Sequence, residues 1–356
     1  MWEFIWIISS WYLMNIIKLF RIKDWLITKL LFNLSFVLSV FYFTNPSFEF
    51  ALVTVCLTCT YIISIGAFGY FVNDWFDSKA DQLSGKSNAT SNLPFSLKIL
   101  IAIILISIGT IPFLLILSES DIYFYLLIIQ IALLLLYSVP PIKLKHNVFG
   151  IITDSLFSFI IPALISLFIV VQNYSNSVLK NPVFIVLILW LFFLGIRSIL
   201  IHQLKDFEND LLSKTRTFTV NIGKTHALFL AKWVLLIEVL CFIALVVLVP
   251  GEFRNIFIIS FAFFLVIEYQ NNARKYWLPE GFPDIASKLN VFYNYYLFLG
   301  LSIFLSIQIS YVYAFFVFVF ILIKQRDIYC LLKTIMLFLF YKSKGAIRRV
   351  RKLFNK

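Results

Sequence analysis

Three aspartates stand at regular spacing in one polar stretch of an otherwise apolar chain. Residues 73–81 have the form N-D-x-x-D-x-x-x-D, from Asn73 to Asp81. On a helix, spacings of three and seven residues place Asp74, Asp77 and Asp81 within about 60° of one another, along roughly 10 Å of its length. Like charges so arranged repel each other, and hard carboxylate oxygens suit Mg²⁺. The stripe therefore predicts a magnesium-binding face.

A second acidic face follows later in the chain. Asp206 and Asp210 are four residues apart and share one side of a helix, with His202 one turn earlier. Two such faces at equal depth on two helices can hold metal ions that bridge carboxylates to the oxygens of a diphosphate and stabilise it as a leaving group. For His202 two roles stay open: a base or hydrogen-bonding partner for an acceptor hydroxyl, or a residue that orients Asp206.

The elements that position these side chains must cross a membrane. The chain has 356 residues, of which 61% are hydrophobic and 13% charged, with a mean hydropathy of +0.93. A soluble domain has about 45–50% apolar and roughly 25% charged residues, so an ordinary cytosolic protein and a disordered chain are both excluded. Long continuous apolar runs, without the alternation of barrel strands, predict helices. We therefore expect an all-α, polytopic membrane protein.

Apolar runs of about 20 residues are long enough to span a bilayer. Nine such runs are found, at residues 25–43, 50–72, 97–117, 122–139, 148–171, 182–201, 225–249, 256–267 with its flanks, and from about 290 onward. The stretch 290–323 is too long for one untilted span, so a tenth crossing stays open. Residues 1–20, with three tryptophans followed by basic residues, predict a helix lying in the membrane interface.

The connections between these runs differ in charge. Long connections after the second, fourth, sixth and eighth runs carry most of the loop lysines and arginines, whereas the alternate connections are short and carry few. Positive loops stay cytoplasmic, so both acidic faces are expected at the cytoplasmic side. The net charge of +12 then indicates contact with anionic lipid, and nucleic acid is not an expected partner. The four cysteines lie in apolar stretches and are interpreted as packing residues.

These residues resemble the UbiA superfamily of intramembrane prenyltransferases. The first motif of that family matches Asn73, Asp74, Asp77 and Asp81 in full. The second, D-x-x-x-D followed by a Thr-containing stretch and a Gly, is similar to Asp206, Asp210, Thr217 and Gly223. A third likeness is Y-S-x-P-P-x-R-x-K after the fourth helix, which here runs from Tyr137 to Lys145. The resemblance covers about residues 18–310.

The resemblance implies nine spanning helices around a central cavity, with a possible extra C-terminal membrane helix. It also implies Mg²⁺-dependent transfer of an isoprenoid group from its polyprenyl diphosphate to a lipid-soluble or amphipathic acceptor. The metal would be held by Asp74, Asp77, Asp81, Asp206 and Asp210, with Asn73 in support. An apolar chamber, which the 41 Phe and 17 Tyr residues can line, would hold the chain and protect a carbocation from water.

Further basic and polar residues near the motifs are candidates for substrate binding. They are Lys86, Lys143, Lys145, His202, Lys205 and Lys214. The chain departs from the family at two of these places: Lys86 lies where many members have an Arg-Pro pair, and Lys214 lies where a Gly is common. For Lys143 and Lys145, closing over the diphosphate and positive-inside anchoring are both open readings.

The expected organisation has three parts: an interfacial helix at 1–20, a transmembrane prenyltransferase domain at 21–310, and a hydrophobic segment with a basic tail at 311–356. The expected location is the bacterial inner membrane, with the site facing the cytoplasm. Two other functions are open. One is a terpene cyclase that needs no acceptor; the other is a cation transporter, although transporter sites usually lie near the bilayer midplane.

Overall fold

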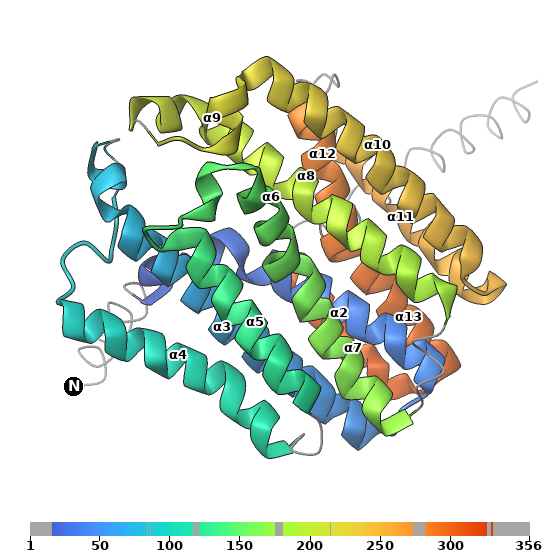
Figure 1. The fold of residues 1–356 in the computed structure, drawn as a ribbon. Helices are drawn as coiled ribbons and strands as arrows, with labels where there is room; N and C mark the ends of the chain where they lie inside the picture. The colour runs from blue at the N-terminus through green and yellow to red at the C-terminus, as the bar shows by residue number, and fades with distance from the viewer. Residues whose placement is uncertain are drawn as a thin grey trace, which may run out of the picture.

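The computed structural model of the chain is a bundle of helices (Figure 1). It describes residues 16–83, 85, 87–116, 121–174, 181–213, 215–272, 282–325 and 329, and these residues contain no strand. The expected all-α fold is confirmed. The elements in chain order are α2 (Ile22–Thr44), α3 (Phe48–Leu83), α4 (Phe95–Ile116), α5 (Asp121–Ser138), η1 (Leu144–His146), α6 (Val148–Ser155), η2 (Leu156–Ile160), α7 (Ile161–Tyr174), α8 (Pro182–Leu212), α9 (Phe218–Ile222), α10 (Lys224–Leu248), α11 (Gly251–Asn272), α12 (Phe282–Val291), η4 (Phe292–Tyr296), α13 (Leu297–Gln308), η5 (Tyr311–Tyr313) and α14 (Ala314–Ile323).

Every one of the nine predicted apolar runs coincides with a helical segment of this bundle. Among the described residues, seven helices are long and apolar enough to cross a membrane. The helices α5 and α11 are not among these seven, so the predicted count of nine spans is not confirmed. The helix α4 is apolar around its whole circumference and largely exposed, as expected for a face that meets lipid.

The helix α2 lies at the centre of the bundle, in contact with α3, α7 and α13 (Figure 1). Its middle part, from Leu31 to Phe41, is almost entirely buried. A membrane protein has little hydrophobic driving force between its helices, so close packing stabilises such contacts. The first acidic motif begins where the neighbouring helix α3 leaves this packed region.

A close approach fixes α6 against α8. A Cβ atom on Gly195 of α8 would lie 2.7 Å from Cα of Ser155, so only glycine allows the two helices to lie this near. The hydroxyl of Ser155 donates a hydrogen bond of 2.7 Å to the carbonyl oxygen of Phe192 on α8. This contact joins the helix after the proline element to the helix that carries the second acidic motif.

A buried ion pair connects three further helices. Arg197 of α8 is fully buried and contacts Glu238 of α10 directly through Nε, with a second contact of 3.0 Å from Nη2. It also donates to Asn290 of α12, at 2.7 Å, and to the carbonyl oxygen of Ala286, at 3.1 Å. Every charge in this network has a partner, which such depth requires. These contacts indicate that Glu238 and Asn290 hold neighbouring helices together.

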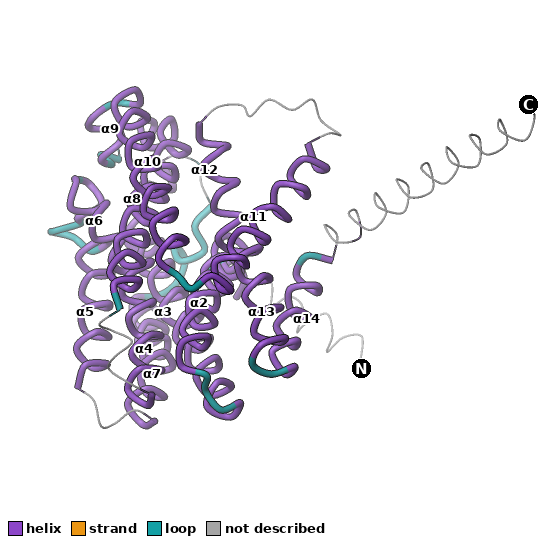
Figure 2. Tube along the Cα trace, turned by 90° about the vertical axis from the view of Figure 1, so that its right-hand side faces the viewer, coloured by secondary structure: helices purple, strands orange, loops and turns teal. Residues whose placement is uncertain are grey.

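The last apolar stretch does not form one long helix. The helix α13 ends at Gln308, and the chain turns at Ser310, whose side chain accepts a hydrogen bond from the backbone N–H of Val312. The helix α14 then lies beside α13 (Figure 2). No glycine or proline marks this turn, which is why the sequence left it open. The predicted interfacial helix and basic tail lie mostly outside the described residues.

Candidate active site

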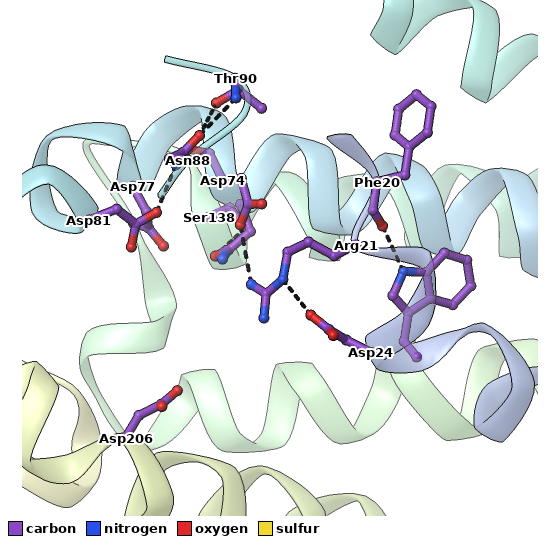
Figure 3. A network of polar contacts seen from close by, with 12 residues as sticks. Phe20, Arg21, Asp24, Asp74, Asp77, Asp81, Asn88, Thr90, Ser138 and Asp206 are labelled. Carbon is purple, nitrogen blue, oxygen red and sulfur yellow. Dashed lines mark hydrogen bonds and ion pairs between the residues drawn. The ribbon is translucent and has the colours of Figure 1, made fainter. Parts of the chain in front are cut away.

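The first motif lies on the continuation of α3, as predicted. This helix runs without a break through Asp74, Asp77 and Asp81 to Leu83, so all three side chains project from one element (Figure 3). Asp74 is 8% exposed. The three carboxylates do not share one partner: each contacts a different polar group, and those groups come from three separate segments of the chain.

Asp74 is paired with an arginine from the start of α2. Nη1 of Arg21 lies 3.4 Å from Oδ1 of Asp74, while its Nε lies 2.9 Å from Asp24 (Figure 3). Arg21 precedes α2 with a φ of 49°, a left-handed conformation that directs the chain into the helix. Its guanidinium also lies over the ring of Tyr70, 5.5 Å from the centroid. This arginine places a positive charge at the inner end of the aspartate stripe.

The entry of α2 is held in place by an aromatic stack. Trp25 stacks on Tyr70 of α3 at 5.5 Å with an interplanar angle of 9°, and its indole nitrogen donates 2.8 Å to the carbonyl oxygen of Phe20. Such pairs contribute about 0.5–1.5 kcal/mol beyond area burial. The stack therefore fixes Arg21 relative to the stripe on α3.

Asp77 is paired with two lysines of the proline element. Nζ of Lys143 lies 3.1 Å from its Oδ1, and Nζ of Lys145 contacts its Oδ2 directly. Lys145 also donates 3.2 Å to Oδ1 of Asn73, and Ser138 donates to the same oxygen. Burial lowers the pKa of Lys145, and the adjacent Asp77 carboxylate opposes that effect. The structure thus brings the first motif and the third together around one carboxylate.

A glycine makes the position of these lysines possible. A Cβ atom on Gly150, in the first turns of α6, would lie 2.4 Å from the carbonyl oxygen of Leu144 and 2.6 Å from Cα of Lys145. The helix therefore packs directly on the backbone of η1. Lys145 is 6% exposed, and its Nζ contacts Asp77.

Asp81 is held by a residue that sequence reasoning did not single out. Nδ2 of Asn88 donates 2.7 Å to Oδ2 of Asp81 and 2.7 Å to the carbonyl oxygen of Asp74. Its Oδ1 accepts from the backbone N–H and the hydroxyl of Thr90, at 2.9 and 2.7 Å. Asparagine is a common turn residue because its side chain bonds the backbone two residues on, so a turn at Asn88 was detectable from the sequence, whereas its contact with Asp81 was not. Asn88 fastens this loop to the stripe.

The second motif lies on the last turns of α8. Nε2 of His202, which is 62% exposed, lies 3.7 Å from Oδ2 of Asp206. Asp210 accepts a hydrogen bond of 3.1 Å from the hydroxyl of Thr217, in the segment that folds back after the helix. Lys205 donates 3.1 Å to Ser287 of α12. The structure thus places His202 beside Asp206 and ties Thr217 to the motif.

The two acidic faces lie at the same end of the bundle. Nδ2 of Asn221, in the segment that follows the second motif, donates a hydrogen bond of 2.8 Å to the carbonyl oxygen of His146, which is next to Lys145. Figure 3 shows Asp206 on its own helix, turned toward the aspartates of α3. Both faces therefore line one region, with the proline element beside them. Lys86 and Lys214, two predicted substrate contacts, lie outside the described residues.

The described side chains do not by themselves form a closed metal cage. No group of three or more Asp, Glu, His or Cys residues in the described ranges is gathered closely enough to hold a metal ion. Mg²⁺, however, is usually bound by one or two carboxylates together with substrate phosphates. Carboxylates on two helices at the same end of the bundle, with three cations beside those of α3, fit an ion that arrives with a phosphate-bearing ligand.

An apolar pocket lies deeper in the bundle. Its walls come mainly from α2, α8, α10 and α11 and include Phe32, Phe184, Trp190 and Phe257. The cavity volume is about 40 Å³, room for a few water molecules and too small for an isoprenoid chain unless the lining side chains move. Phe32 packs edge-on against Phe159 of η2, at 5.4 Å between ring centroids. The chain therefore has a polar end with paired charges and an aromatic pocket within the same bundle.

Known proteins share this architecture. The model of the UbiA prenyltransferase family matches residues 33–296. No curated protein matches the chain. A UbiA homologue from Archaeoglobus fulgidus, solved bound to GPP and Mg²⁺, is similar with a TM-score of 0.57 and 16% identity, over 82% of this chain and 99% of that one.

Two further structures show the same likeness. The Archaeoglobus fulgidus homologue bound to DMAPP and Mg²⁺ has a TM-score of 0.54 and 17% identity, over 81% of this chain and 99% of that one. A digeranylgeranylglyceryl phosphate synthase has a TM-score of 0.53 and 15% identity, over 81% of this chain and 96% of that one. At such identities these structures establish the fold, while the residues of each site must be argued from this chain.

Proposed function

We propose a reaction for this chain, which belongs to the UbiA prenyltransferase family: it transfers an isoprenoid group from a polyprenyl diphosphate to a lipid-soluble or amphipathic acceptor. The main observation behind the proposal is that three cationic side chains lie against the aspartates of α3. Arg21, Lys143 and Lys145 come from two distant segments and lie against Asp74 and Asp77. Such a mixed cluster suits a ligand with several negative charges and its metal ions.

The donor half of the reaction is supported by the family and by its solved members. The Archaeoglobus fulgidus homologue was solved with GPP or DMAPP and Mg²⁺, which are an isoprenoid diphosphate and a metal of the kinds proposed here. In this chain the metal would be held by Asp74, Asp77, Asp81, Asp206 and Asp210. Mg²⁺ would supply the charge neutralisation that lets a diphosphate leave.

The chain's own residues have separate tasks in this reaction. Lys143 and Lys145 bind the diphosphate oxygens, and Arg21 does so from the opposite side of the stripe. The isoprenoid chain would enter between the aromatic side chains of the apolar pocket, which must move apart to admit it, and this apolar lining would keep water away from the carbon that loses its oxygen. The bond from that carbon to the diphosphate oxygen breaks, and the diphosphate leaves with the electron pair. The acceptor atom bonds to the same carbon and gives up its proton to solvent. Asn73 and Asn88 hold Lys145 and Asp81 in position.

The helices make this an integral membrane protein. We place the site at the cytoplasmic face of a bacterial inner membrane, because the loops that carry the lysines of the site are the positively charged ones. A soluble diphosphate headgroup reaches the site from the cytoplasm, while its chain enters the bundle from the lipid side.

A transfer assay tests the proposal. Purified protein in nanodiscs is incubated with radiolabelled isoprenyl diphosphates, Mg²⁺ and a cell extract that supplies acceptors. The proposal expects a labelled lipid product and release of diphosphate, both lost on removal of Mg²⁺. Release of diphosphate with a labelled hydrocarbon in the absence of extract would instead indicate a terpene cyclase. No release of diphosphate under any condition would contradict both.

A further inference from the structure

A short hairpin arm that follows α13 lies outside the site described so far. Its residues, 309–324, comprise η5 and α14, and we call them the C-terminal strap. They lie beyond residue 296, where the match to the family model ends. Figure 2 shows α14 beside α13 at the edge of the bundle, so the strap adds a layer outside that helix. Its role is therefore inferred from its own contacts.

One contact of the strap is with α2. Val40 of α2 lines the apolar pocket, whereas the next residue, Phe41, faces the strap. The ring centroid of Phe41 lies 6.2 Å from that of Tyr313, which is buried. Successive residues of a helix point about 100° apart, so the pocket and the strap lie on different sides of α2.

The strap packs in the same way against α13. Leu297 lines the apolar pocket, whereas the ring of Phe298 lies 6.2 Å from that of Phe316 on α14. One turn further along α14, Phe320 is buried, with its ring 6.3 Å from that of Tyr296. The strap thus contacts both helices of one pocket wall. The seam where α2 meets α13 separates it from the pocket.

The opposite face of α14 is exposed. Phe315 and Phe318 on that face are 60% and 56% exposed, as expected for side chains that meet lipid. Lipid chains are as apolar as these rings, so packing within the membrane has little hydrophobic driving force. The ring contacts of the strap can therefore be exchanged for contacts with lipid at low cost.

Other walls of the pocket are fastened by stronger contacts. Arg254, near the start of α11, donates to three backbone carbonyl oxygens at the end of α10, at 2.7–3.2 Å. A Cβ atom on Gly300 of α13 would overlap Oγ of Ser260, so α11 packs closely on α13. The wall from α8 is held by the buried pair of Arg197 and Glu238. The seam beneath the strap is the wall with the weaker cover.

The cavity of about 40 Å³ admits an isoprenoid chain only when a wall moves. We propose that the C-terminal strap is a movable cover of the seam between α2 and α13, and that its displacement lets the chain of a polyprenyl donor pass from the lipid into the pocket. The inference rests on the proposed function and adds selection by chain length. A donor with a single prenyl unit reaches the aspartates without movement of the strap, whereas a polyprenyl donor requires that movement.

A reversible cross-link tests this proposal. The four native cysteines are replaced by alanine, and Phe41→Cys and Tyr313→Cys are introduced, so that a short bis-methanethiosulfonate joins the strap to α2. Association of dimethylallyl and polyprenyl thiolodiphosphates, which bind without reacting, is measured in nanodiscs with Mg²⁺. We expect the cross-link to slow association of the polyprenyl probe at least about 10-fold and to leave the dimethylallyl probe within about twofold. Reduction of the cross-link is expected to restore the rate, and Tyr313→Cys alone, treated with the same reagent, is the control.

A loosened strap tests the same point without a cross-link. Phe316→Ala removes a ring that packs on Phe298, so the strap is held by one aromatic contact fewer. Association of the polyprenyl probe is expected to become about 2- to 10-fold faster, with no change for the dimethylallyl probe. Phe315→Ala is the matched control, because it removes an exposed ring from the other face of the same helix. It is expected to change neither rate.

Equal association of the polyprenyl probe before and after cross-linking would overturn the proposal. Equal slowing of both probes would also overturn it, because the strap would then act on the polar end. Failure of the two cysteines to cross-link would contradict the position of the strap on α2. If the reduced cysteine variant binds neither probe, the comparison of Phe316→Ala with Phe315→Ala decides, and equal rates in those two variants overturn the proposal. Wild type that binds neither probe refutes the proposed function itself, which is a separate result.

Discussion

Lys145 and Asp77 are 68 positions apart in the chain, and their charged groups are in direct contact. The contact joins a loop between α5 and α6 to the acidic stripe of α3. Since Lys145 also donates to Asn73, one buried ammonium group connects the first residue of the motif to Asp77 in its middle. This arrangement makes the positions of cation and carboxylate depend on each other.

Replacement of Lys145 by methionine tests the role of its charge. Charge-assisted hydrogen bonds contribute about 1.5–3 kcal/mol, so we expect Lys145→Met to weaken binding of an isoprenyl thiolodiphosphate roughly 10- to 100-fold. Lys224→Met is the control, because Lys224 is exposed and pairs with Glu208 on the surface. Equal affinity in Lys145→Met and wild type would remove Lys145 from the diphosphate site.

A methyl group on Gly150 tests how the lysines are positioned. In Gly150→Ala the new Cβ meets the backbone of Leu144 and Lys145 at 2.4–2.8 Å, so η1 must shift away from α6. We expect folded protein whose affinity for the thiolodiphosphate falls about 10-fold or more, because a small displacement of binding groups is costly. Gly251→Ala is the control, since nothing lies within 4 Å of its Cβ position. Full affinity in Gly150→Ala would show that the loop is free to adjust.

Asn88 is expected to act through Asp81. Asn88→Ala removes the donor to Asp81, whereas Asn88→Asp also faces Asp81 with a second negative charge. Transfer is expected to fall in both, and more steeply in Asn88→Asp, with a higher Mg²⁺ concentration needed for half-maximal rate. Ser91→Ala, which removes only a hydroxyl bonded to the Asn88 backbone, is the matched control. A Mg²⁺ requirement equal in all variants would argue against Asp81 as a ligand.

The Arg197–Glu238 pair is expected to stabilise the fold without acting on substrate. Removing one partner leaves a buried charge, so Glu238→Gln is expected to cost about 3–5 kcal/mol and to lower the unfolding temperature in detergent. The exposed Lys224–Glu208 pair gives the contrast: Glu208→Gln changes stability by less than about 1 kcal/mol. Replacement of both Arg197 and Glu238 by apolar residues is expected to restore stability. Persistent instability of the double variant would contradict this account.

Much of the bundle was predictable because apolar runs of spanning length are unambiguous. The positions of all nine helical segments and the face shared by Asp74, Asp77 and Asp81 follow from spacing alone. The turn at Ser310 was not predictable, because the chain turns there through a serine N-cap and no glycine or proline marks the position in the sequence.

The contacts that the site residues make with distant segments could not be predicted without the tertiary structure. Nothing in the local sequence shows that Arg21 reaches Asp74, or that Asn88 bonds both Asp81 and the Asp74 backbone. Lys205 was a candidate substrate contact by its place in the second motif, and in the structure it bonds Ser287 of α12. Its role in substrate binding stays a prediction.

The central claim is that aspartates from two helices bind one diphosphate through Mg²⁺. Binding of a labelled isoprenyl thiolodiphosphate to purified protein, with and without Mg²⁺, measures this directly. The account predicts Mg²⁺-dependent binding that is lost in Asp74→Asn and equally in Asp206→Asn, and retained in Glu208→Gln, a neighbouring acid on the same helix. Undiminished binding in Asp206→Asn, or binding that does not require Mg²⁺, would contradict it.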